Sequence, residues 1–269
     1  MTATAAADLL ATIVAATRHG VEFRQSVCPI SLLERQTDHV PRGQAFMDAV
    51  RSSDPPRIIA ECKRRSPSRG ILRPDYDPAA HAASYAAAGA AAISVLTEPA
   101  FFDGSLDHLR KVRAAVTIPV LRKDFIVTDY QMYEAAALGA DAILLIVGAL
   151  DDLSLSRLLR LARQLGLAAL VEVHDAVELV RGVEAGAAVI GVNSRNLRTM
   201  TVSHDVLQVV AEEFCLLRPE GVVLVAESGI RTADDVRRVG AFGYDACLVG
   251  ERLITQPDPG GALRELRRS

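Results

Sequence analysis

Residues 57–70 read RIIAECKRRSPSRG, a short apolar run that gains charge at its far end and then breaks into a loop. The pattern predicts a buried β-strand over residues 58–63. Because strand side chains alternate between two faces, Glu61 and Lys63 point the same way, and Cys62 points to the opposite face, into the core. Buried charges are costly unless they are paired, so the two charges are either a structural ion pair or part of a polar site.

Short aliphatic runs and longer helical stretches alternate along the rest of the chain. The predicted strands cover residues 58–63, 92–96, 120–123, 142–147, 168–172, 189–193, 222–227 and 246–249. Such alternation predicts βα units in a parallel sheet. The composition agrees, because half of the 269 residues are hydrophobic and only 4% are aromatic. An aliphatic core of this kind suits parallel strands that are covered by helices.

A glycine-containing repeat groups these units in pairs. The repeats begin at Gly89, Gly139, Gly186 and Gly243, each at the end of a helical stretch and before every second strand. Glycine fits the position after a helix, where a left-handed backbone conformation is needed. Four repeats of two βα units, spaced by roughly 50 residues, give the eight strands of a closed TIM (β/α)8 barrel. An open doubly wound sheet is the rival, but its glycine-rich dinucleotide fingerprint is missing after the first strand.

The residues before the first strand look helical, with apolar stripes around Ile13 and Phe46. We therefore predict an α/β fold, a TIM (β/α)8 barrel with an N-terminal helical extension. The extension covers residues 1–56 and packs on the barrel or caps one of its ends, and packing is slightly favoured. The catalytic barrel covers residues 57–269.

Composition and charge argue against several classes of function. A net charge of −3 leaves no basic footprint for nucleic acid or an anionic membrane. The cysteines, Cys28, Cys62, Cys215 and Cys247, have neither C-x-x-C nor metal-ligand spacing, which indicates free thiols in a reducing compartment. The chain begins without the basic segment of a signal peptide and has no run of membrane-spanning length. We expect a cytoplasmic protein that binds neither nucleic acid nor membranes.

The predicted strands end in polar residues, at the barrel face where TIM-barrel enzymes place their active sites. These residues are Glu61, Lys63, Lys123, Glu172, Asn193, Arg195, Glu227 and Ser228. A single lysine at a strand end is commonly a solvated charge. A random surface would not repeat this pattern after so many aliphatic runs, so the set predicts a catalytic site.

A phosphate site is predicted in the loops after the last two strands, which contain Gly229 and Gly250. Backbone N–H groups of glycine turns and helix N-termini bind phosphate, and these loops are its usual place in TIM barrels. Thr232 is the predicted N-cap of a helix that begins near residue 233. Ser66, after the first strand, can donate another hydrogen bond. Alternatively, the two glycines only permit tight turns.

Five segments together resemble the indole-3-glycerol phosphate synthase family, in order and in spacing. They are ECKRRSPS at 61–68, LRKDFI at 121–126, VEVH at 171–174, GVNSRNL at 191–197 and AESGI at 226–230. The resemblance runs from about residue 32 to the C-terminus. It implies that 1-(2-carboxyphenylamino)-1-deoxyribulose 5-phosphate closes its ring and loses CO₂ and water, in tryptophan biosynthesis, without metal or cofactor. Cys62, Asn196 and Arg252 depart from the family pattern, but none of these departures removes a catalytic group.

The resemblance also implies roles for individual residues. Lys123 becomes the general acid and Glu172 the general base. The catalytic set is completed by Glu61, Lys63, Asn193 and Glu227, with support from Arg195. The phosphate contacts fall on Ser66, Ser228, Gly229, Gly250 and Glu251, and the walls around the anthranilate ring fall on Phe102, Phe125 and Leu197. Phe102 lies in a polar loop, where its alternative role is that of a loop anchor.

The residue chemistry fits that reaction. Lys123 can protonate the departing oxygen if burial or Lys63 lowers its pKa, a shift that nearby carboxylates oppose. Lys63 can hold the substrate carboxylate, and Glu172 or Glu61 can accept the released protons. Two alternatives stay open: a Schiff-base aldolase that uses Lys123, and a phosphate-sugar-binding barrel without catalysis. We expect no metal site, and we expect any isomerase or glutaminase partner to be a separate chain.

Overall fold

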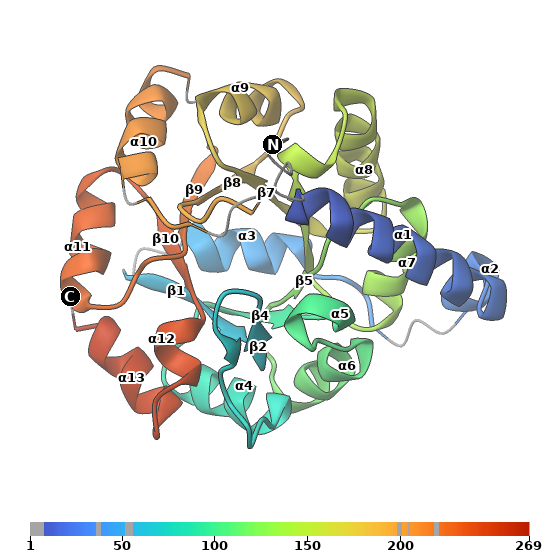
Figure 1. Ribbon diagram of the computed structural model, residues 1–269, viewed down its shortest axis with the longest axis horizontal. Helices are drawn as coiled ribbons and strands as arrows, with labels where there is room; N and C mark the ends of the chain where they lie inside the picture. Colours follow the sequence, from blue (N-terminus) through green and yellow to red (C-terminus); the bar gives the residue numbers. More distant parts are fainter. Residues whose placement is uncertain are drawn as a thin grey trace, which may run out of the picture.

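The computed structural model describes residues 8–35, 39–51, 56–197, 201–203, 205–217 and 221–268. Within these residues, parallel strands form a closed barrel in the order β1-β10-β9-β8-β7-β6-β5-β4 (Figure 1). The strands are β1 Arg57–Cys62, β4 Ala92–Leu96, β5 Val120–Lys123, β6 Ala142–Ile146, β7 Ala168–Val173, β8 Val189–Asn193, β9 Val223–Glu227 and β10 Ala246–Val249. The predicted TIM barrel is therefore confirmed.

The predicted strands agree with the observed ones to within one residue at either end. The loop after β1 also contains a small antiparallel hairpin of β2 (Arg65–Ser66) and β3 (Gly70–Ile71), which was not predicted. Gly70 adopts a φ of 69° at this turn, a conformation that favours glycine. The hairpin holds the loop beside the open end of the barrel.

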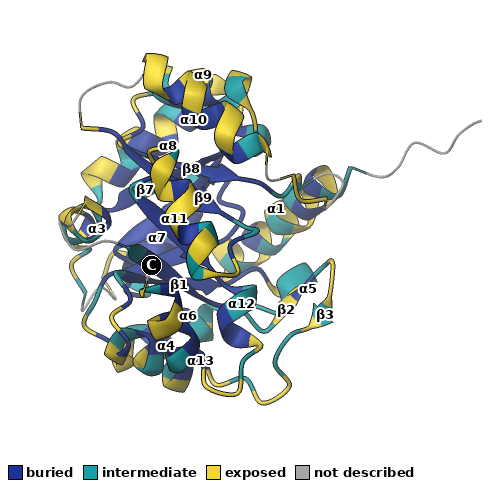
Figure 2. Cartoon of the chain, turned by 90° about the vertical axis from the view of Figure 1, so that its left-hand side faces the viewer, coloured by how far each residue is buried: buried dark blue, intermediate teal, exposed yellow. Residues whose placement is uncertain are grey.

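Helices surround the barrel and bury one face each against the strands (Figures 1 and 2). The outer helices are α4 Pro78–Ala87, α6 Leu106–Ala115, α7 Asp129–Ala137, α8 Asp152–Gln164, α9 Ala176–Glu184, α10 Asp205–Leu217, α11 Ala233–Ala241 and α13 Pro259–Leu266. Shorter helical turns at strand ends are α5 Pro99–Phe102, η1 Val147–Ala149 and α12 Glu251–Ile254. No helix within the described ranges has the length and apolar character needed to cross a membrane.

The glycines of the sequence repeat adopt the predicted left-handed conformation. Gly89, Gly139, Gly186 and Gly243 have φ values of 89°, 91°, 83° and 95°. Gly89, Gly139 and Gly186 each directly follow the C-cap residue of a helix, and Gly243 follows that of α11. The chain can therefore leave each helix and enter the next strand without steric strain.

The N-terminal helices lie at opposite ends of the barrel. The helix α3 (Gly43–Arg51) buries Phe46 and Val50 in one cluster with residues from the first positions of several strands, so it closes the N-terminal end. The longer helix α1 (Leu9–Val27) contacts α5 and η1 at the other end (Figure 2), and α2 (Ile30–Leu33) follows it (Figure 1).

The N-terminal extension thus has helices at both ends of the barrel. Its predicted boundary, between residues 56 and 57, adjoins residues 52–55, which lie outside the described part of the chain, and it stays a prediction.

Candidate active site

A cavity of about 410 Å³ opens at the carboxyl ends of the strands. Every site residue predicted from the sequence lines it: Glu61, Lys63, Ser66, Phe102, Lys123, Phe125, Glu172, Asn193, Arg195, Leu197, Glu227, Ser228, Gly229, Gly250 and Glu251. Cationic side chains that the sequence analysis did not assign to the site, Arg69, Arg231 and Arg252, also line the cavity. The barrel therefore brings residues from distant segments to one place, and their individual roles remain predictions.

Lys123 is the centre of the charge arrangement in this cavity. Its ammonium Nζ donates hydrogen bonds to Glu172 Oε2 at 3.0 Å and to Glu227 Oε2 at 3.2 Å. The three side chains come from the carboxyl ends of β5, β7 and β9. These are every second strand of the barrel, and such strands contribute side chains to a common layer. Both carboxylates are almost completely buried, with side-chain exposures of 1% and 2%. One ammonium group thus contacts two buried carboxyl groups.

The carboxylates around Lys123 oppose a lowered pKa, as the sequence suggested, and they prevail. Burial alone would lower its pKa, but Glu172, Glu227 and Glu61 raise the pKa above its ordinary value. The Lys63 ammonium is paired with the Glu61 carboxylate. Lys123 therefore carries a proton at neutral pH, and its carboxylate neighbours stabilise the charged form.

The pKa values of the two carboxyl groups beside Lys123 are shifted in opposite directions. Burial raises the pKa of Glu172, but Lys123 and His174 outweigh burial and hold that pKa well below its usual range. Burial and the nearby Glu172 raise the pKa of Glu227, and Lys123 offsets only part of this shift. Two like charges that share one cation favour a state in which only one is ionised. Glu172 is the anionic partner of the pair.

Glycines make room for two of these carboxylates. A Cβ atom on Gly250 would collide with the Glu61 carboxylate, and a Cβ atom on Gly191 would collide with the Glu227 carboxylate. Gly250 was predicted only as part of a phosphate loop. The structure shows that any side chain there would also displace Glu61.

The loop after β9 has an unusual backbone conformation. Ser228 and Gly229 adopt successive left-handed φ values of 67° and 74°. A non-glycine residue in this region is strained and marks a functional position when its surroundings hold it there. Here the Ser228 hydroxyl donates a hydrogen bond to Asn193 Oδ1 at 2.8 Å. The predicted cap is confirmed, because Thr232 caps α11, which starts at Ala233.

Other polar groups also line the cavity. The Ser66 hydroxyl is buried and has no hydrogen-bond partner among the residues that the structure describes. Arg69 forms an ion pair with Glu251, at the start of α12. A phosphate in this region would meet a free hydroxyl donor and nearby guanidinium groups.

Aromatic side chains form the apolar wall. The ring centroids of Phe102 and Phe125 are 6.1 Å apart, with an interplanar angle of 37°. Phe102 was expected in a loop, but it ends the short helix α5. The buried Glu98 carboxylate accepts hydrogen bonds from the backbone N–H groups of Ala100, Phe101 and Phe102 and so holds this helix in place.

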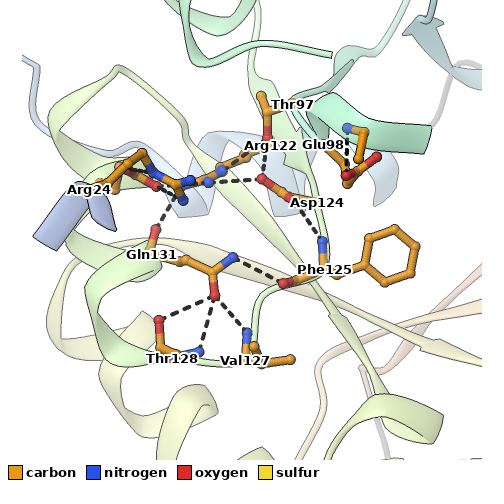
Figure 3. Close-up of polar contacts among 11 residues, drawn as sticks. Arg24, Thr97, Glu98, Arg122, Asp124, Phe125, Val127, Thr128 and Gln131 are labelled. Carbon is orange, nitrogen blue, oxygen red and sulfur yellow. Dashed lines mark hydrogen bonds and ion pairs between the residues drawn. The ribbon is translucent and has the colours of Figure 1, made fainter. Parts of the chain in front are cut away.

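An ion-pair network is centred on the buried Arg122, the neighbour of Lys123 in β5 (Figure 3). Arg122, the preceding residue, points away from the cavity because strand side chains alternate. Its guanidinium is fully buried and donates to Asp124 Oδ2 and Glu134 Oε2, each at 2.9 Å, and to Thr97 Oγ1 at 3.2 Å. Arg24 of α1 binds the same Glu134 carboxylate at 2.6 Å. The network ties the N-terminal helix to the strand that carries Lys123.

The same network shapes the turn after β5. Asp124 Oδ1 accepts a hydrogen bond from Phe125 N at 2.8 Å, and Gln131 Nε2 donates to Phe125 O at 3.0 Å. Gln131 Oε1 accepts from Val127 N at 2.9 Å. This support was not predicted from the sequence, although Arg122, a charged residue on the outward face of a buried strand, was a signal for it.

Known proteins resemble this chain in sequence and in fold. The family model of indole-3-glycerol phosphate synthase matches residues 10–266. The indole-3-glycerol phosphate synthase of Albidiferax ferrireducens is 45% identical over 262 residues, which cover 96% of this chain and 98% of that protein. The protein of the same name from Nocardioides sp. is 54% identical over 230 residues, which cover 81% and 87%.

A solved structure of 3-hexulose-6-phosphate synthase matches with a TM-score of 0.61 at 15% identity, over 79% of this chain and 98% of that one. This likeness shows a shared fold alone. The sequence relatives and the family model decide the family: the chain belongs to the indole-3-glycerol phosphate synthases.

Proposed function

We propose that this chain converts 1-(2-carboxyphenylamino)-1-deoxyribulose 5-phosphate to indole-3-glycerol phosphate, CO₂ and water, as a carboxy-lyase of tryptophan biosynthesis. The observation that carries the proposal is the Lys123 ammonium held between Glu172 and Glu227, in a cavity that also has an aromatic wall and a left-handed Ser228–Gly229 turn. The residues proposed as proton donor, proton acceptor, ring contacts and phosphate contacts all line this one cavity, which supports the proposal.

Lys123 acts as the general acid and Glu172 as the general base. Lys123 holds a proton at neutral pH and can give it to the ketone oxygen of the substrate, which becomes a hydroxyl group as the ring closes and is lost as water in the later dehydration. The positive charge of Lys123 is one reason why Glu172 is a weak base beforehand. Once Lys123 has donated its proton, that charge is gone and Glu172 becomes more basic. The acid step therefore prepares the base step that removes a proton from the new ring.

The remaining residues bind and orient the substrate. Lys63, paired with Glu61, lies in the cavity as a cation for the carboxylate that leaves as CO₂. Asn193 accepts hydrogen bonds from the Ser228 hydroxyl and from Arg195 N, so it fixes the loops after β8 and β9 relative to each other. The phosphate contacts are assigned to Ser66, Ser228, Gly229, Gly250 and Glu251, and the ring contacts to Phe102, Phe125 and Leu197.

A Schiff-base mechanism is less well supported by this geometry. An amine attacks a carbonyl only in its neutral form. The carboxylates around Lys123 stabilise its charged form and raise its pKa. Acid catalysis uses the protonated lysine directly, so the observed surroundings favour it.

The proposed setting is cytoplasmic, with a phosphorylated small molecule as the binding partner and neither nucleic acid nor membrane involved. The cysteines Cys28, Cys62, Cys215 and Cys247 are free thiols, as expected for a reducing compartment.

The test is a direct assay with the proposed substrate, in which indole absorbance and released CO₂ are followed together in buffer with excess EDTA. We expect both signals in equimolar amounts, because lysine and carboxylate groups can supply every proton transfer. Indole formation that disappears with EDTA would reveal a required metal. No indole from well-folded protein would favour a phosphate-sugar-binding barrel, and an adduct on Lys123 trapped by borohydride would favour the Schiff-base route.

A further inference from the structure

His174 lies directly behind Glu172, one residue past the end of β7. The two side chains are two positions apart, so they lie on the same face of the chain. His174 Nε2 is 3.4 Å from Glu172 Oε1. The sequence comparison with the family gave His174 no role.

A second carboxylate orients the imidazole from its other side. Glu178, on α9, accepts a hydrogen bond from His174 N at 2.9 Å with Oε2, and the same oxygen lies 3.1 Å from His174 Nδ1. The backbone contact fixes this carboxylate relative to the histidine, and the ring contact fixes the ring. Nε2 is thereby directed at Glu172.

The contact between His174 and Glu172 is poised to become a hydrogen bond. Lys123 binds Glu172 Oε2, whereas Glu172 Oε1 and His174 Nε2 are buried atoms without a hydrogen-bond partner among the described residues. Unpaired buried polar atoms are costly, and these two face each other at 3.4 Å. A small rotation of either side chain would pair them, and catalytic hydrogen bonds commonly tighten in this way when substrate binds.

The charges around His174 favour the donor form on both ring nitrogens. Burial alone would lower the pKa of His174, but Glu172 and Glu178 raise it to about 10. At neutral pH the ring is therefore an imidazolium, with an N–H group toward each carboxylate.

We propose that His174, oriented by Glu178, is a positioning residue that holds the Glu172 carboxylate through Oε1. The inference rests on the proposed role of Glu172 as the general base. When Lys123 gives up its proton, its hold on Oε2 weakens. His174 then keeps Glu172 in place, so that Oε2 stays directed into the cavity for the base step.

The test compares two substitutions of His174 in steady-state kinetics. His174→Leu removes both ring donors and should lower kcat by about 10-fold or more, because a hydrogen bond to a charged group is lost, with little change in KM. His174→Gln places an amide N–H near the position of Nε2 and should recover much of kcat. His81→Leu is the control, since His81 is a buried histidine of α4 outside the cavity, and it should leave kcat unchanged.

A kcat of His174→Leu within about 2-fold of the wild type would overturn the proposal. So would a glutamine variant as impaired as the leucine variant. If His174→Leu fails to fold, Glu178→Gln removes the orienting charge and keeps an acceptor, and it should lower kcat at constant KM. Unchanged kcat in that variant would equally overturn the proposal.

A readout without turnover separates this inference from the proposed function. Nitrogen-15 NMR of labelled histidine should show both ring nitrogens of His174 protonated at pH 8 in the wild type, and Glu178→Gln should lower its pKa. A neutral His174 ring at pH 8 would overturn the inference whether or not the enzyme turns over. If the wild type shows no turnover but His174 is protonated, the proposed function is rejected, whereas the contact between His174 and Glu172 is supported.

Discussion

Arg122→Met tests whether the buried network behind Lys123 stabilises the barrel. Methionine roughly preserves side-chain volume, so the main change is loss of the charge that pairs with Asp124 and Glu134. Removing one partner of a buried ion pair costs about 3–5 kcal/mol. Asp124 keeps the Thr97 hydroxyl and the Phe125 amide, and Glu134 keeps Arg24. We therefore expect the lower end of this range, about 3 kcal/mol.

The matched control is Arg24→Met, at the outer end of the same network. The Arg24 side chain is 31% exposed, and Glu134 would still be paired with the buried Arg122. The loss should be about 1 kcal/mol, as for ion pairs near the surface. The double variant should lose more than the sum of the single losses, because the buried Glu134 then has neither guanidinium.

Urea unfolding followed by circular dichroism measures these free energies at pH 7. Arg122→Met should also lower the Tm by about 6–12 °C for a chain of this size. The reasoning is refuted if Arg122→Met is no more destabilising than Arg24→Met, or if the double variant is simply additive. Either result would mean that the buried Arg122 guanidinium is not needed to stabilise the Asp124 and Glu134 carboxylates.

Four further outcomes are expected. Lys123→Ala should lower turnover by about 10²-fold or more with an unchanged circular dichroism spectrum, and near-normal turnover would reject its acid role. Glu172→Gln should cut turnover while a reduced substrate analogue still binds in equilibrium titration; unchanged turnover would move the base role to Glu61. Gly250→Val should weaken binding of phosphorylated ligands and also lower turnover, because the valine side chain would collide with the Glu61 carboxylate. If saturating substrate restores normal turnover, Gly250 serves only phosphate binding. The pKa of His174 is raised in the folded state to about 10, so its stabilisation is complete below the unfolded pKa of about 6.5 and is lost as the pH rises through 10. Urea unfolding of His174→Gln should lack this part of the decline, and equal pH slopes in variant and wild type would contradict the assignment.

The sequence by itself determined the barrel and the set of residues at its open end. The strands were predictable because aliphatic runs, helix stops and the glycine repeat are local signals. Gly89 and its equivalents need a left-handed backbone. Thr232 caps its helix by accepting a hydrogen bond from Asp235 N, only three residues further along the chain. The polar strand ends followed as well, because parallel strands of a barrel place all their carboxyl ends on one face. Family resemblance then suggested which of these groups do the chemistry.

Only the tertiary structure decided how those groups act on one another. The pKa of Lys123 rises because Glu172 and Glu227, which are 49 and 104 residues away in the chain, lie within 3.2 Å of its ammonium. The ion pairs of Arg122 and the contact between His174 and Glu172 likewise depend on distances of a few ångströms between side chains that the fold brings together. Electrostatic energies in a buried site change steeply with such distances and with the loss of solvent. A local sequence pattern carries neither quantity, so it named the charged residues without giving their protonation states.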